Sequence, residues 1–317
     1  MAKIQEVNFQ IVKKFFHQLI GSKKIGAYFR EELEKIKILS AQPMVKQIMA
    51  MKHPVQDLRS VEFSAFSQWG DDGIIQYLIH ILPITESTFI EFGVGNYLEA
   101  NTRFLLLNNN WKGLIFDGST QNMEFVKNDS ISWKHDLTAL PLFVTKHNIN
   151  KAIEEAGFAG EIGILHIDID GNDYWIWDCL EVVNPQIVIM EYNSMFGNKA
   201  PISVPYDDQF YVTDAHYSNL YFGASLKAMC HLAEKRGYSF VGSNSNGNNA
   251  YFVRNDKMGT LEAVSAEQGY VAARFRQNRN EAGELTHTSD AKAIWKAKDK
   301  MVVNVSTGEK GPLSNFL

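Results

Sequence analysis

The chain has 317 residues, of which 45% are hydrophobic, 21% charged and 12% aromatic, a composition typical of a globular protein with a sizeable core. Its formal net charge of −5 argues against a nucleic-acid partner, because such proteins usually present a basic surface. Neither a signal peptide nor an apolar run long enough to cross a bilayer is evident, so we expect a cytoplasmic protein.

The first 63 residues alternate lysine and glutamate with apolar residues at helical spacing, which predicts amphipathic helices. One apolar stripe comprises Phe9, Val12, Phe16, Leu19 and Ile20, and a second comprises Phe29, Leu33, Ile36 and Ile38. Acidic residues are mixed in, so packing on the main domain or on a second subunit is favoured over a membrane surface. We therefore expect an N-terminal helical extension that could support a homo-oligomer.

From residue 64 to residue 255, short β-branched and apolar runs alternate with helical segments. The predicted strands are Thr88–Phe92, Gly113–Asp117, Ile131–Lys134, Ile162–Ile169, Gln186–Glu191, Ser239–Ser243 and Asn249–Val253. The predicted helices are Leu98–Asn108, Gln121–Lys127, Ile149–Glu155, Tyr174–Leu180 and Ser225–Arg236. This alternation predicts βαβ units and a mostly parallel sheet. The turn between the last two strands is too short for a helix, which predicts an antiparallel hairpin.

This order of strands sets the expected fold class. Five parallel βα units followed by a reversed hairpin are the order of a class I methyltransferase sheet, whereas the strands of a dehydrogenase Rossmann domain all run parallel. We therefore expect an α/β, Rossmann-like fold with a mostly parallel seven-stranded sheet. Cys179 and Cys230 fall in two of its helices without metal-binding spacing, so we expect both to be reduced and buried.

Residues 256–317 lose the strand pattern and become polar, which predicts a C-terminal appendage lying over the main domain. One helix is predicted there, at Ser289–Lys298. An arginine cluster that includes Arg274 and Arg276 begins this region, and its planar guanidinium groups match the geometry of a phosphate. The cluster could hold a phosphorylated or nucleotide-linked substrate, or it could form a solvated helical face.

The end of the first predicted strand carries the glycine-rich segment Glu91–Asn96. Gly93 and Gly95 allow the backbone to turn sharply and to approach a ligand closely. The third glycine of the dinucleotide fingerprint is missing, so the segment favours a cofactor with a carboxylate and no phosphate, held in part by Glu91. A tight βα turn without a ligand is the alternative.

Four further residues are candidates for the cofactor site. Asp117 ends the second predicted strand about 20 residues later, where a carboxylate can accept hydrogen bonds from both ribose hydroxyls of an adenosine, and Ser119 follows it. Asp136, after the third predicted strand, is either a partner for the adenine amino group or a helix N-cap. Ser67, at a predicted helix start, either contacts the ligand or only caps the helix.

The fourth predicted strand ends in the most polar stretch of the sheet. Alternation places His166, Asp168 and Asp170 on one face, where ionisable groups are costly unless they are used or paired. This edge of an open α/β sheet is where ligands bind, so the motif predicts a site for an acceptor hydroxyl with a base, a divalent ion, or both. The alternative is that Asp170 or Asn172 caps the next helix.

The neighbouring strand ends in Glu191, Tyr192 and Asn193. Together with Asp168, the Glu191 carboxylate and the Asn193 amide oxygen form a set of hard ligands that suits Mg²⁺, Mn²⁺ or Ca²⁺. His216 lies on a long polar loop that could close over this site or could simply belong to the surface.

These motifs resemble the FkbM-like family of S-adenosylmethionine-dependent methyltransferases, and more narrowly its branch from bacterial surface-polysaccharide gene clusters. The resemblance covers about residues 64–280 and is carried by the segments Ser67–Gly73, Phe89–Gly95, Ile167–Tyr174 and Glu191–Asn193. It implies a class I fold, S-adenosylmethionine as donor, and methyl transfer to a hydroxyl, often of a sugar. The departure from the family lies at Asn96 and Tyr97, where many relatives have an acidic-glycine step.

The family roles imply that Glu91, Gly93 and Asp117 serve the cofactor, while Asp168 and the Glu191/Asn193 pair serve the acceptor. The sequence thus predicts an O-methyltransferase for a sugar hydroxyl, which could belong to a nucleotide-linked sugar. The candidate bases are Asp168, Asp170 and His216, and the candidate acceptor-binding residues are Asn172, Tyr192, Arg274 and Arg276. The alternative is a non-catalytic binding or assembly protein that keeps the fold without transferring a methyl group.

Overall fold

The protein is described from a computed structural model, which places residues 23–273, 277–286 and 293–317. The chain divides into two compact units between Pro43 and Met44, earlier than the predicted boundary after residue 63. Leu58, Val61 and Phe63 explain the difference, because all three are buried within the second unit.

A single long helix, α2 (Lys23–Met49), accounts for the described residues of the first unit and continues to Met49. The second predicted apolar stripe, from Phe29 to Ile38, falls on this helix as expected. The first stripe, from Phe9 to Ile20, lies outside the described residues. None of the described helices has the length and hydrophobicity that crossing a bilayer requires.

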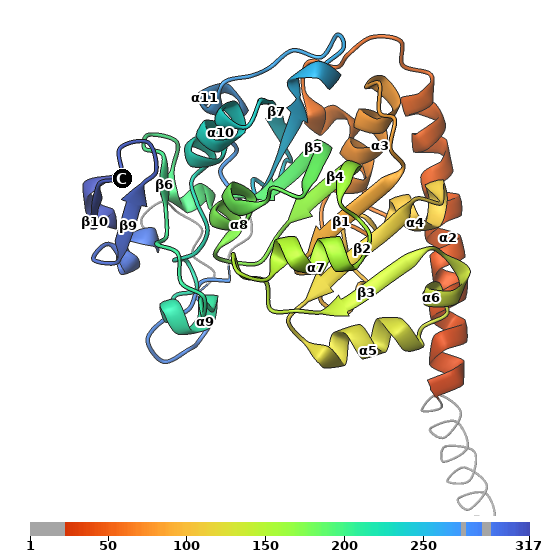
Figure 1. The fold of residues 1–317 in the computed structure, drawn as a ribbon, viewed down its shortest axis with the longest axis horizontal. Helices are drawn as coiled ribbons and strands as arrows, with labels where there is room; N and C mark the ends of the chain where they lie inside the picture. Colours follow the sequence, from red (N-terminus) through yellow and green to blue (C-terminus); the bar gives the residue numbers. More distant parts are fainter. Residues whose placement is uncertain (1–22, 274–276, 287–292) are drawn as a thin grey trace, which may run out of the picture. The chain divides into compact units, whose positions relative to one another are not determined.

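The second unit is built on a seven-stranded sheet in the order β3-β2-β1-β4-β5-β8-β7 (Figure 1). Its strands are β1 (Thr88–Phe92), β2 (Lys112–Asp117), β3 (Leu137–Pro141), β4 (Gly160–Ile167), β5 (Val183–Glu191), β7 (Tyr238–Ser243) and β8 (Asn249–Arg254). The first five strands pair in parallel, and β8 runs antiparallel to both β5 and β7. The predicted fold class, including the terminal hairpin, is confirmed.

Helices connect the strands. They are α3 (Asp71–Ile81), α4 (Arg103–Asn109), α5 (Thr120–Asn128), α6 (Ile131–Lys134), α7 (Ile149–Glu155), α8 (Asp173–Cys179) and α10 (Leu226–Lys235), with shorter turns at η1 (Leu58–Val61), η2 (Ser194–Phe196), α9 (Val212–Ala215), η3 (Asn255–Lys257) and α11 (Ala266–Gly269). The apolar core lies between sheet and helices, where Leu165, Val188 and Trp177 are fully buried. Cys179 and Cys230 are free thiols as predicted, although each is only partly buried.

The predicted third strand is wrong. Ile131–Lys134 forms helix α6, in which the Asp129 side chain accepts a hydrogen bond from the Ile131 amide at 3.1 Å. The third strand is instead Leu137–Pro141, which pairs with β2 from Gly113 to Asp117. Because β3 is an edge strand in which only Ala139 is buried, it lacks the apolar run by which an inner strand is predicted.

A second, three-stranded sheet joins segments that are far apart in the sequence. Strand β9 (Met301–Asn304) lies between β6 (Ile202–Ser203) and β10 (Lys310–Pro312). Residues 194–224 and 293–317 share a small apolar core around Phe196, Leu220 and Val302, and we call these two segments the cap. The C-terminal region therefore contains strands that were not predicted.

Two short 3-10 helices complete the described part of the cap, η4 (Ala293–Ala297) and η5 (Leu313–Asn315). The helix predicted at Ser289–Lys298 is therefore only a 3-10 turn where the structure describes it, and residues 289–292 lie outside the described residues.

Candidate functional site

Two adjoining cavities lie at the carboxyl ends of the parallel strands, the edge at which open α/β sheets bind ligands. The first has a volume of about 520 Å³ and the second about 490 Å³. Gly93, Asp168 and Asp170 line both cavities, so the two spaces meet at the ends of β1 and β4.

The glycine-rich turn after β1 forms the boundary between the cavities. Gly93 has a φ of +76°, and a Cβ atom there would lie 1.6 Å from the Asp168 carbonyl oxygen, so only glycine fits. Gly95 also has a positive φ, and its amide donates a hydrogen bond to Asp117 Oδ2 at 2.8 Å. The predicted sharp turn is confirmed, and it ties the end of β1 to the end of β2.

A buried ion pair closes the inner wall of the first cavity. His166 Nδ1 lies 2.8 Å from Glu91 Oε1, and both side chains are only 3% exposed. Burial alone would raise the pKa of Glu91, but the hydrogen bond and charge of His166 hold it below its ordinary value. Burial would likewise lower the pKa of His166, yet Glu91 keeps it raised. Both groups are therefore held in their charged forms.

The Glu91 carboxylate also organises the chain that follows the glycine turn. Oε1 accepts from the Asn101 amide and Oε2 from the Thr102 amide, each at 3.0 Å, and the Thr102 hydroxyl donates to Oε2 as well. Glu91 lines the first cavity, but its oxygens already accept four hydrogen bonds from the protein. Its predicted contact with a cofactor stays a prediction.

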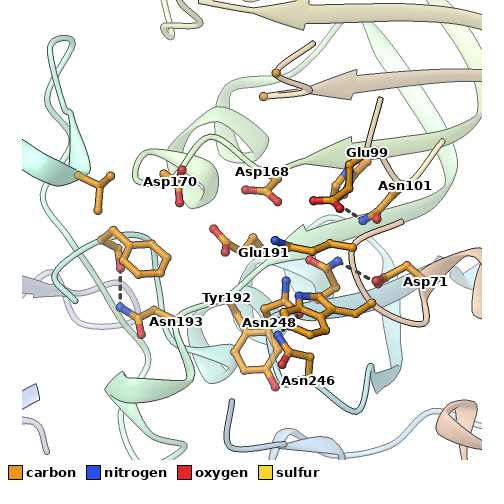
Figure 2. Close-up of a pocket in the computed structure, with 18 of the residues that line it drawn as sticks. Asp71, Glu99, Asn101, Asp168, Asp170, Glu191, Tyr192, Asn193, Asn246 and Asn248 are labelled. Carbon is orange, nitrogen blue, oxygen red and sulfur yellow. Dashed lines mark hydrogen bonds between the residues drawn. The ribbon is translucent and has the colours of Figure 1, made fainter. Parts of the chain in front are cut away.

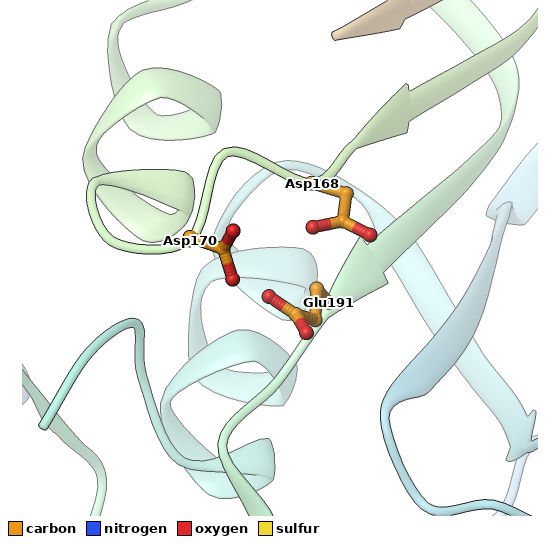
Figure 3. A group of neighbouring side chains, drawn as sticks. All are labelled: Asp168, Asp170 and Glu191. Carbon is orange, nitrogen blue, oxygen red and sulfur yellow. The ribbon is translucent and has the colours of Figure 1, made fainter. Parts of the chain in front are cut away.

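Three carboxyl groups converge where the cavities meet. Asp168, Asp170 and Glu191 each offer an oxygen within 4.8 Å of the others, and Figure 3 shows the three groups facing one another. Burial raises the pKa of Asp168 to about 8, and the charge of Asp170 adds to the shift. Burial, and then the charge of Asp168, raises the pKa of Glu191 well above its ordinary value. The three groups therefore resist simultaneous ionisation.

This cluster fits a divalent cation by the chemistry of its donors. Three carboxylates are hard ligands of the kind that Mg²⁺, Mn²⁺ and Ca²⁺ prefer. Glu191 Oε2 is buried and has no hydrogen-bond partner among the described residues, so a cation would satisfy it. Asp170 reaches the cluster from a left-handed backbone with a φ of +54°. The Asp173 carboxylate holds this turn by accepting from the Ile169 and Gly171 amides, both at 2.8 Å.

Asn193, a predicted metal ligand, uses its side-chain amide in hydrogen bonds within the protein. Its Nδ2 donates to the carbonyl oxygens of Leu220 at 2.9 Å and Phe222 at 3.0 Å, and its Oδ1 accepts from the Met195 amide at 3.0 Å. The amide thus anchors the cap to the end of β5. Asp170, which was predicted only as a base, takes the third position in the cluster.

The second cavity combines a carboxylate with apolar walls. Asp117 Oδ1 accepts from the Ser119 amide at 2.9 Å and from Asn122 Nδ2 at 3.0 Å, and all three residues line the cavity. Leu142 and Phe143, after β3, line the same cavity, as does Phe210 of the cap. Such a slot suits a nucleoside, with its base between apolar groups and its ribose near the carboxylate.

Two predicted cofactor residues lie elsewhere. Ser67 uses its hydroxyl within the start of α3, accepting from the Asp72 amide and donating to the Trp69 carbonyl. Asp136 precedes β3 instead of following the third strand, and its carbonyl oxygen accepts from Gly113 at the start of β2. It therefore lies at the opposite edge of the sheet, and its predicted place beside an adenine is wrong.

The residues predicted to serve the acceptor do not lie together in one cavity. Asn172 lines the second cavity and donates to the Asp207 carbonyl at 2.7 Å, whereas Tyr192 lines the first and donates to the Val271 carbonyl at 2.9 Å. His216 borders neither cavity, and its Nδ1 lies 2.7 Å from the Ser218 hydroxyl. Its predicted role as a base is therefore not supported by position. Arg274 and Arg276 lie outside the described residues.

Sequence reasoning missed the amide groups on the far side of the first cavity. Because β8 is antiparallel, its first residue Asn249 pairs with Glu191, which brings the β7–β8 turn to the ligand-binding edge. Asn246 and Asn248 of this turn line the cavity, and Figure 2 shows them opposite the carboxylate cluster. The signal was present in the sequence as four asparagines within residues 244–249.

No protein-family model matches the chain, and no curated protein matches it in sequence. The comparison with solved structures returns the O-methyltransferase from Bacillus cereus in complex with SAH, at 11% identity over 77% of this chain and 97% of that chain, with a TM-score of 0.38. A SAM-dependent methyltransferase from Geobacter sulfurreducens in complex with S-adenosyl-L-homocysteine has 11% identity over 62% of this chain and 71% of that chain, with a TM-score of 0.34.

The StiE O-MT structure has 10% identity over 49% of this chain and 47% of that chain, with a TM-score of 0.30. This chain therefore spans about half the length of that structure. The fold assignment rests on the chain's own strand order, in which five parallel strands are followed by an antiparallel hairpin.

Proposed function

We propose that the protein is an S-adenosylmethionine-dependent O-methyltransferase that acts on a sugar hydroxyl. One observation carries the proposal: a cavity lined by Asp117 and apolar side chains joins a cavity lined by carboxylates, and the two share Gly93, Asp168 and Asp170. A donor in one and an acceptor in the other would meet beside carboxylates that can take a proton. The sequence resemblance to methyltransferases of surface-polysaccharide clusters supports a sugar as the acceptor.

The second cavity provides the donor half. Asp117 would accept hydrogen bonds from the ribose hydroxyls, and Phe143 and Leu142 would contact the adenine. At Gly95 a Cβ atom would meet nothing within 4 Å, so this part of the turn leaves room for the methionine part to pass towards the first cavity. When bound, S-adenosylmethionine would supply an electrophilic methyl group on a sulfonium.

The carboxylate cluster provides the acceptor half. A carboxylate of the cluster would take the proton that the hydroxyl loses when its oxygen receives the methyl group, and the donor would leave as S-adenosylhomocysteine. A carboxylate with a raised pKa is a better base than an ordinary one. Asp168, whose pKa burial and the nearby Asp170 raise to about 8, is the first candidate, and Asp170 is the second. Alignment of the two reactants would provide much of the rate.

A divalent cation fits the same place. Asp168, Asp170 and Glu191 would hold it, with Asp170 replacing the predicted ligand Asn193. It would polarise the acceptor hydroxyl and lower its pKa. The three carboxylates would then remain ionised together, which their proximity otherwise opposes.

Calorimetry with S-adenosylhomocysteine tests the donor half. We expect the wild-type protein to bind it and Asp117→Ala to weaken binding about tenfold or more, because the ribose contact is lost. Asn128→Ala, on the exposed end of α5, is the matched control and should bind like wild type. Absence of binding by the wild-type protein would refute the proposal. Binding without methyl transfer to any glycan or nucleotide sugar would favour a non-catalytic binding or assembly protein instead.

A further inference from the structure

We infer that the acceptor enters the first cavity as an uncharged sugar, such as a glycoside or an oligosaccharide end, and not as a nucleotide diphosphate sugar. The side chains that would recognise it are those of Gln68, Trp69, Asn246 and Asn248, which we call the amide end. This inference rests on the proposed function and narrows its substrate class.

The inference starts from the charge of the first cavity, which is negative. Six carboxylate side chains line it: Asp71, Glu91, Glu99, Asp168, Asp170 and Glu191. His166 is the one side chain among its described lining residues that can carry a positive charge, and Glu91 already pairs with it. A diphosphate is usually held by arginine, lysine or a bound cation. A divalent ion in the cluster would offset only part of this negative charge, so the described lining residues would still repel a diphosphate.

The turn between β7 and β8 is built to hold its amides in place. Asp71 accepts hydrogen bonds from Asn249 Nδ2 at 2.9 Å, from Asn244 Nδ2 at 3.1 Å and from the Tyr251 hydroxyl. Asn244 Oδ1 in turn accepts from three backbone amides of the turn. Gly247 completes it with a φ of +74°, where a Cβ atom would lie 2.4 Å from the Val271 carbonyl oxygen. The turn therefore has one well-defined conformation.

The hydrogen bonds within the turn also orient the Asn248 amide. Its Oδ1 accepts from Asn244 Nδ2 at 2.9 Å and from Asn246 Nδ2 at 3.2 Å. Because the oxygen is occupied, the half-buried Asn248 side chain has its Nδ2 donor available for a ligand in the cavity. An oriented amide donor suits a hydroxyl oxygen.

Trp69 and Gln68 complete the amide end from the segment before α3. Trp69 is partly exposed and Gln68 exposed, and both line the cavity. An indole offers a flat apolar surface to the C–H face of a sugar ring, while the amides can exchange hydrogen bonds with its hydroxyls. Neutral donors and acceptors beside an aromatic ring thus match a sugar, and they offer no charge to a phosphate.

Matched pairs of acceptors test the inference. Methyl glycosides of glucose, mannose, rhamnose and fucose are compared with UDP-glucose, GDP-mannose, dTDP-rhamnose and GDP-fucose, and the products are detected by the added mass of one methyl group. In any pair that reacts, we expect kcat/KM to be about tenfold or more higher for the methyl glycoside. The carboxylates of the cavity would repel the diphosphate of the nucleotide sugar and so weaken its binding. Higher kcat/KM for the nucleotide-linked member would overturn the inference.

A variant pair tests the amide end itself. Asn248→Asp replaces the donor with a carboxylate, so we expect kcat/KM for the glycoside to fall about tenfold while S-adenosylhomocysteine binding stays unchanged. Asn128→Asp on α5 is the matched control. If Asn248→Asp left kcat/KM unchanged, or if no acceptor reacted although S-adenosylhomocysteine bound, the inference would fail while the donor half of the proposed function stood. Failure of the wild-type protein to bind S-adenosylhomocysteine would instead refute the proposed function.

Discussion

Removing one charge from the carboxylate cluster should make the metal-free protein more stable. We choose Asp170→Asn, because Asp170 crowds Asp168 and Glu191 and has a left-handed backbone that asparagine also tolerates. The substitution therefore changes charge and cation binding without adding backbone strain. A stabilising change at three converging polar groups is expected only if the wild-type arrangement serves a ligand.

The size of the effect follows from the geometry. The three carboxyl groups offer oxygens within 4.8 Å of one another. Two ionised groups at that separation repel by about 3 kcal/mol at an effective dielectric constant of about 20. Because the Asp170 side chain is exposed to solvent, we reduce this figure and expect a gain of about 1–2 kcal/mol in the free energy of unfolding above about pH 8, where Asp168 is ionised as well.

The gain should also depend on pH. Burial and the charge of Asp170 raise the pKa of Asp168 to about 8, above the value of about 3.9 for an unfolded chain. A raised folded-state pKa contributes stability at low pH that is lost as the pH rises through the folded pKa. Between about pH 4 and about pH 8 the wild-type protein should therefore lose stability more steeply than Asp170→Asn, and the variant's advantage should grow over that range.

Urea unfolding in EDTA and in excess Mg²⁺ measures these differences. In EDTA the variant should unfold at higher urea than wild type, whereas Mg²⁺ should stabilise wild type by about 2.7 kcal/mol at a hundredfold excess over its Kd. The variant keeps two of the three carboxylates and should gain much less. Glu124→Gln, an exposed change on α5, controls for loss of one negative charge. A variant less stable than wild type in EDTA, or equal stabilisation of both by Mg²⁺, would refute the reasoning.

The remaining predictions concern the supports of the site. Gly93→Ala should lower the free energy of unfolding by about 3 kcal/mol or more and weaken S-adenosylhomocysteine binding. The added Cβ would collide with the Asp168 carbonyl oxygen, and alanine is disfavoured at this positive φ. Urea unfolding close to that of wild type would contradict this. Burial raises the pKa of Asp72 to about 6, so wild-type stability should fall as the pH rises from about 4 to about 6, and Asp72→Asn should remove about 3 kcal/mol of that dependence. Identical pH slopes in urea titrations of the two proteins would show that Asp72 does not titrate in this way.

The inner strands and the turn after β1 could be predicted because their signals are local. Strands β1, β4 and β5 are buried on both faces, which produces the continuous apolar runs from which they were predicted. The turn at Gly93 needs a positive φ, and a glycine directly after a strand predicts such a turn. The polar stretch after β4 could also be recognised locally, because charged groups are rare at the end of a buried strand.

The predictions from the sequence were wrong where a residue's contacts come from distant parts of the chain. The edge strand β3 has one buried residue, so its pattern was weak, and the shift in its position moved Asp136 to the wrong edge of the sheet. Asn193 has the right chemistry for a metal ligand, but the cap, formed by segments about a hundred residues apart, takes up its amide.

The sequence by itself thus determined the fold class and the strands that carry the site, because periodicity, turn chemistry and burial are properties of neighbouring residues. Only the tertiary structure decided which side chains meet. The antiparallel pairing of β8 with β5 brings the asparagine turn opposite Asp168, Asp170 and Glu191. Such a meeting depends on strand order and register across the whole sheet, which local patterns along the chain do not encode.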